Sequence, residues 1–128
     1  MRAIKALLAV FVLFSANTTL SHAAGTCTVA NIEIKSMRAG FSNKCRTRAC
    51  MAFEGVAVLK NNCREAVGAQ IKITAYAKDG SPLATRELWP ASVRNIPPGD
   101  FEFSLDTWLD YRPGMHKFAL SVVDVKRW

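Results

Sequence analysis

The chain has 128 residues, half of them hydrophobic, a size and composition that suit one globular domain and exclude an array of several. Its 17 lysine and arginine residues outnumber its 10 acidic residues, which gives a formal net charge of +7. A charge of this sign favours contact with anionic surfaces, but it does not identify a partner.

The first segment has the three parts of a secretory signal peptide. Arg2 and Lys5 are basic, an apolar run follows over residues 6–14, and small residues surround Ala23. A membrane anchor is the alternative, but an anchor needs about 20 apolar residues, and residues 15–19 are mostly polar. We therefore expect export, with cleavage after Ala23.

The predicted organisation is a signal peptide over residues 1–23 and a single domain over residues 24–128. Cleavage after Ala24 is the alternative. No later segment is long and apolar enough to span a membrane, so we expect the mature protein to be soluble, and periplasmic or secreted.

The cysteines are all in the predicted mature part, at Cys27, Cys45, Cys50 and Cys63. An even number of cysteines in a small exported chain predicts two disulfides. A zinc site is the alternative, but the chain has no Cys-x-x-Cys pair and the spacing does not match a zinc ribbon. Neither a metal nor another cofactor is predicted.

Apolar and polar residues alternate along most of the mature part, which predicts strands. In chain order these cover residues 28–35, 51–60, 69–77, 83–89, 101–106 and a last strand that contains Phe118, Leu120 and Val122. Residues 37–50 break the alternation and are predicted to form a long loop. Prolines and glycines mark turns at residues 79–80, 96–99 and 112–114. The pattern predicts an all-β fold, a small antiparallel immunoglobulin-like β-sandwich of about six to seven strands.

Four cysteines allow three connectivities, and the expected strand pairing ranks them. If residues 28–35 and 51–60 pair antiparallel, the loop 37–50 joins their near ends. Their far ends then bring Cys27 beside the turn that holds Cys63, which leaves Cys45 and Cys50 together in the loop. The pairs Cys27–Cys63 and Cys45–Cys50 are therefore favoured.

Three segments follow one another in a recognisable order: Phe-Glu-Gly-Val-Ala-Val at residues 53–58 with Asn61 closing the strand, Ala-Tyr-Ala-Lys-Asp-Gly at 75–80, and Ile-Pro-Pro-Gly at 96–99 followed by Phe-Glu-Phe at 101–103. In these segments the chain resembles the immunoglobulin-like FxLYD modules of bacterial envelope proteins. The resemblance covers about half the chain and departs from the family in the cysteines and in the basic loop. It implies a sandwich fold and a scaffold or interaction role, with no catalytic residues.

No constellation of side chains predicts catalysis. His116, the one histidine of the mature part, is expected to be an exposed residue beside a turn. Ser121 and Asp124 are near it in sequence but fall on opposite faces of one strand, so the three do not converge. We expect a protein that is not an enzyme.

The loop at residues 37–50 carries the strongest candidate for a binding site. Within it and just before it are five basic residues and no acid: Lys35, Arg38, Lys44, Arg46 and Arg48. Arginine forks suit phosphate or carboxylate groups, and Phe41 could add an apolar contact. The alternative is a solvated loop that keeps the protein soluble. Nucleic acid is not an expected partner, because an exported protein rarely meets it and the basic residues have no aromatic platform interleaved among them on which bases could stack.

These observations favour a binding or assembly module of the bacterial envelope that recognises an unknown protein or an anionic surface polymer. The alternative is a secreted inhibitor or immunity-type protein that blocks a hydrolase with its stapled loop. A second group of residues could form either a lid over the core or a partner surface, namely Trp89, Trp108, Tyr111 and Trp128.

Overall fold

The computed structural model describes residues 26–47 and 49–128. They form a short 3-10 turn and six strands, arranged in two antiparallel sheets of three strands each. The all-β, two-layer architecture predicted from the sequence is confirmed. The predicted signal peptide and Arg48 lie outside the described residues.

The first sheet has the order β1-β2-β5, with β1 (Ile32–Asn43) and β5 (Gly99–Ser104) on either side of β2 (Met51–Asn61). Antiparallel pairing places Phe41 opposite Phe53 and Ala57 opposite Phe103. These side chains face the second sheet, whereas the alternate residues of each strand face outward.

The second sheet has the order β4-β3-β6, in which β3 (Gly68–Ala77) is central between β4 (Pro82–Leu88) and β6 (Met115–Lys126). Ile71 and Ile73 of β3 are fully buried between the sheets. The core also includes residues of the connections, among them Ile96, Leu105 and Trp108. These connections close the side of the sandwich between β4 and β5.

The first strand is longer than predicted, because residues 37–43 belong to β1 and not to a loop. A β-bulge at Lys35 places one extra residue between the pairs that Ile34 and Ser36 make with β2. The bulge shifts the alternation by one residue, so the inward positions continue at Met37. Only residues 44–50 connect β1 to β2.

Both predicted disulfides are confirmed. Cys27 bonds Cys63 with a Cα–Cα distance of 5.7 Å, and Cys45 bonds Cys50 at 5.5 Å. The first disulfide joins the segment before β1 to the turn after β2. The second closes the connection between β1 and β2.

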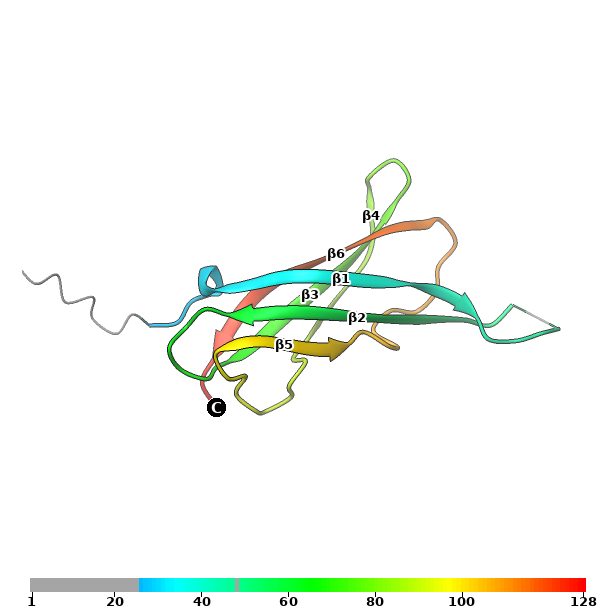
Figure 1. Ribbon diagram of the computed structural model, residues 1–128. Coiled ribbons are helices and arrows are strands. Elements are labelled where there is room, and N and C mark those ends of the chain that lie inside the picture. Colours follow the sequence, from blue (N-terminus) through cyan, green and yellow to red (C-terminus); the bar gives the residue numbers. More distant parts are fainter. Residues whose placement is uncertain (1–25, 48) are drawn as a thin grey trace, which may run out of the picture.

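The β1–β2 hairpin reaches beyond the second sheet, as Figure 1 shows. Its connecting loop is the outermost described part of that end of the molecule, whereas Trp128 lies at the opposite end. The long hairpin therefore carries Lys44 and Arg46 away from the body of the sandwich, whereas Lys35 and Arg38 lie along β1 within it.

Candidate functional site

The root of the hairpin is fixed by a cluster of aromatic rings. Phe41 of β1 lies 5.0 Å from Phe53 of β2 between ring centroids, and Phe118 of the other sheet lies 5.8 Å from Phe41. Tyr111 meets Phe41 edge-on at 5.3 Å. Aromatic pairs of this kind add about 0.5–1.5 kcal/mol each beyond the burial of their area. Phe41 therefore anchors the hairpin to the sandwich.

The tip of the hairpin, residues 44–50, is held closed at its neck. The Asn43 side-chain oxygen accepts hydrogen bonds from the backbone N–H groups of Cys45 and Cys50, each at 3.1 Å. The Lys44 backbone N–H donates to the Cys50 carbonyl oxygen at 3.1 Å. Together with the disulfide, these bonds restrict the tip before any partner is bound. Binding would therefore cost less conformational entropy than it would for an open loop.

Two of the predicted basic residues are paired with acids on the outer face of the first sheet. Lys44 forms an ion pair with Glu54, and Ser42 donates a hydrogen bond of 2.9 Å to the same carboxylate. These bonds from Lys44 and Ser42 lower the pKa of the Glu54 carboxyl. Lys35 reaches Asp100 of β5 at 2.7 Å, and this contact raises the pKa of Lys35.

Of the basic residues predicted to form the site, Arg38 and Arg46 have no ion pair within residues 26–47 and 49–128. Arg46 is exposed at the tip, next to the paired Lys44. Arg38 is exposed on the outer face of β1, opposite Val56 of β2. The structure thus places Lys44 and Arg46 in the same tip segment, while Arg38 lies nearer the body and Phe41 lies at the root. The contribution predicted for Arg48 stays a prediction.

The four aromatic residues predicted to form a lid or a partner surface belong to separate clusters. Trp108 is buried against Phe103, with ring centroids 5.6 Å apart. Trp89 and Trp128 pack edge-to-face at 5.5 Å, and Tyr111 belongs to the hairpin root. They do not form a single exposed patch.

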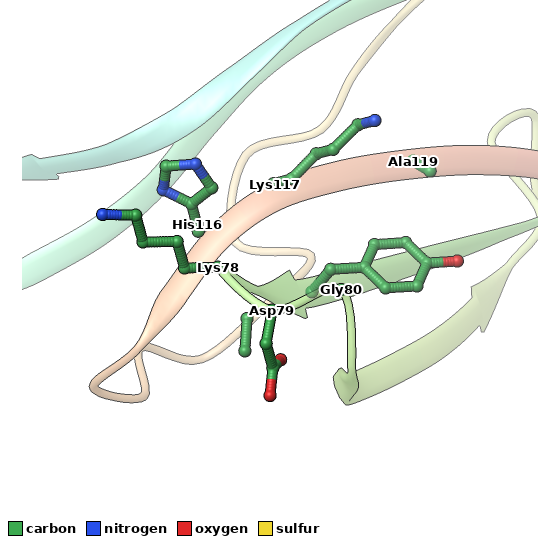
Figure 2. A pocket seen from close by; sticks show the side chains of 8 residues that line it. Lys78, Asp79, Gly80, His116, Lys117 and Ala119 are labelled. Atoms are coloured by element: carbon green, nitrogen blue, oxygen red, sulfur yellow. The ribbon is translucent and has the colours of Figure 1, made fainter.

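A shallow hollow lies on the outer side of the second sheet, where the β3–β4 turn meets the start of β6 (Figure 2). Its volume is about 530 Å³, and its lining includes Tyr76, Lys78 and His116. The sequence predicted only that His116 would be exposed, which it is. No sequence pattern indicated the hollow, since the residues that line it are about 40 positions apart and meet through the β3–β6 pairing.

Within the described residues, no group of three or more histidine, cysteine and acidic side chains is placed to hold a metal ion.

Comparison of the chain with family models, with curated proteins and with solved structures gave no match.

Proposed function

We propose that this protein is an exported, non-catalytic binding or assembly module of the bacterial envelope, and that the tip of its β1–β2 hairpin is the recognition element. The observation that carries the proposal is the projecting, disulfide-closed tip with an exposed Arg46 that has no ion pair among the described residues. A rigid protrusion can enter a partner's groove with little cost in conformational entropy.

The charge at the tip favours a partner with carboxylate or phosphate groups. Glu54 already balances Lys44, so Arg46 is the described cation of the tip that remains available to a partner. Its planar guanidinium can make two parallel hydrogen bonds to one carboxylate or phosphate. An acidic protein surface or an anionic envelope polymer has this chemistry.

Two further points support placement outside the cytoplasm. Both disulfides suit an oxidising compartment, because such bonds rarely persist where thiols are kept reduced. The leader over residues 1–23 adds the sequence features of export.

In the part of the chain that the structure describes, no helix has the length and apolarity required to cross a bilayer. The resemblance to FxLYD modules is consistent with an interaction role and stays a prediction.

The test is capture of envelope components on the immobilised, processed protein, with quantification by mass spectrometry. We expect Arg46→Glu to reduce the amount of captured partner by about tenfold or more. In the complex the substitution would place a glutamate against the partner's anionic group, and like charges in contact at an interface cost several kcal/mol. Arg94→Glu is the matched control, since Arg94 is exposed in the β4–β5 connection and not in the hairpin. Capture that is equally strong with Arg46→Glu would refute the recognition role of the tip.

The inhibitor function is a second candidate, and the same protruding tip favours it. A short loop closed by its own disulfide and projecting from a sandwich is suited to enter the active-site cleft of a hydrolase. In that case the captured partner would be a hydrolase, bound one-to-one with loss of its activity. A partner that keeps full activity in the complex would exclude inhibition and leave the assembly role.

A further inference from the structure

Two residues follow the last strand, and both are held by side chains from other parts of the chain. The β3–β6 ladder ends where Gly68 pairs with Lys126, so Arg127 and Trp128 lie beyond it. They are at the end of the molecule opposite the hairpin tip (Figure 1). These two residues can therefore leave their contacts without breaking any pair of the ladder.

The main chain of Trp128 is held by a side-chain amide. The Trp128 backbone N–H donates to the Asn95 side-chain oxygen at 2.9 Å, and the Asn95 amide nitrogen donates to the Trp128 carbonyl oxygen at 3.3 Å. An amide can do this because it carries a donor and an acceptor side by side. Any residue other than proline offers the same two backbone groups, so Asn95 recognises a peptide chain and not a particular side chain.

The indole ring of Trp128 occupies a slot lined by Gly68, Trp89 and Asn95. A Cβ atom at Gly68 would lie 2.5 Å from the indole Nε1, so the ring fits only because position 68 is glycine. The Trp89 ring packs edge-to-face against it at 5.5 Å, and the Lys126 ammonium group lies 3.9 Å from its centroid. Both contacts favour a ring with an electron-rich face, and tryptophan has the best such face for a cation.

A carboxylate beside the slot favours a basic residue before the ring. Glu65, in the turn between β2 and β3, forms an ion pair with Arg127. The Glu65 backbone is fixed by a hydrogen bond of 3.0 Å from the Asn61 amide to its carbonyl oxygen. Both charged side chains are exposed, so their pairing adds little affinity, but it disfavours an acid at this position.

We propose that this slot is a peptide-binding site, and that Arg127 and Trp128 block it as an autoinhibitory plug. When the plug leaves, the slot takes a segment of a partner protein in which a basic residue precedes tryptophan. The plug defines this chemistry, because a partner must make the same contacts to replace it. Trp128 is 43% exposed, so its release uncovers far less apolar surface than the loss of a core residue.

The test is an NMR titration of the ¹⁵N-labelled processed protein with the peptide acetyl-Lys-Arg-Trp-amide. We expect the full-length Trp128→Ala protein, whose slot lacks the indole, to bind the peptide, with shifts of the Trp89 indole N–H and the Asn95 side-chain amide. The unchanged protein should bind at least about tenfold more weakly, because its own tethered segment competes at a high effective concentration.

Matched peptides and substitutions then locate the site. Acetyl-Lys-Arg-Ala-amide should not bind measurably, and acetyl-Lys-Glu-Trp-amide should bind more weakly, because its acid faces Glu65. Gly68→Ala combined with Trp128→Ala should abolish binding, since the added methyl group fills the floor of the slot. Gly40→Ala combined with Trp128→Ala is the control, because a Cβ atom at Gly40 has no neighbour within 4 Å.

Hydrogen exchange of the unchanged protein tests the plug without any substitution. The backbone N–H of Trp128 should exchange at least about tenfold faster than that of Ile73 in the buried centre of β3, because a plug opens locally. Equal exchange would mean that residues 127–128 open only with the whole fold, which would overturn the plug.

Three results of the titration would also overturn the proposal: no binding of the tryptophan peptide by the Trp128→Ala protein, equal binding by the unchanged protein, or full binding when Gly68→Ala is added. The slot is far from the hairpin tip and its function does not depend on the one proposed there. Arg46→Glu should leave peptide binding unchanged, so failure here and failure of the hairpin proposal are separate outcomes.

Discussion

At the scale of single residues, Asn61 joins the turn that follows β2 to the distant segment at Ile96. It is only 2% exposed at the end of β2. Its amide nitrogen donates to the carbonyl oxygens of Glu65 at 3.0 Å and Ile96 at 2.9 Å, and its side-chain oxygen accepts from the Cys63 N–H at 2.9 Å. A buried amide in this position satisfies backbone groups that water cannot reach.

We expect Asn61→Ala to lower the free energy of unfolding by about 2–4 kcal/mol, because the substitution leaves buried backbone groups without partners. Urea denaturation of the oxidised protein measures this. Asn62→Ala is the control, since Asn62 is exposed and, in the described part of the chain, bonds only through its backbone N–H, so its effect should stay within about 0.5 kcal/mol. Equal losses in both variants would show that the Asn61 side chain does not have this role.

At the scale of elements, the β1–β2 hairpin depends on the close approach of its strands at Gly55. A Cβ atom at Gly55 would lie 2.4 Å from the Arg38 carbonyl oxygen and 2.7 Å from the Ala39 Cβ. Gly40, on the neighbouring strand, has no atom within 4 Å of the same position. The two glycines therefore have different roles in one hairpin.

We expect Gly55→Ala to destabilise the fold by about 2–3 kcal/mol, because the strands must move apart to relieve the clash. Gly40→Ala should be neutral or slightly stabilising, since alanine restricts the unfolded chain more than glycine does. Thermal unfolding of both variants by circular dichroism is the measurement. A Gly55→Ala protein with the melting temperature of the parent would contradict the close approach seen in the structure.

The elements also show what the sequence could and could not predict. Strict alternation identified the strands from 51–60 onward, and the antiparallel pairing of the first two ranked the disulfides correctly. The second half of β1 was missed because the bulge at Lys35 shifts its phase, and because Gly40, Ser42 and Asn43 are residue types typical of a loop. The basic residues of the tip were visible as a charge cluster. The hollow was not visible, because its lining residues are distant in sequence and meet only through the β3–β6 pairing.

At the scale of the whole molecule, the two disulfides constrain very different lengths of chain. Cys27–Cys63 spans 36 positions and encloses β1, the hairpin tip and β2, whereas Cys45–Cys50 spans 5 positions at the tip alone. Both cysteines of the first pair also contact the core. In the chain-entropy account, the stabilisation from a cross-link grows with the length of the loop that it closes.

We therefore expect Cys27→Ser with Cys63→Ser to lower the free energy of unfolding by about 4 kcal/mol, and Cys45→Ser with Cys50→Ser to lower it by about 2 kcal/mol. Guanidinium denaturation of each double variant measures the difference. Partner capture should show the opposite order: the tip variant stays folded yet binds less, because its recognition loop is no longer preorganised. If the tip disulfide contributed more to stability than the Cys27–Cys63 bond, its main role would be in folding rather than in recognition.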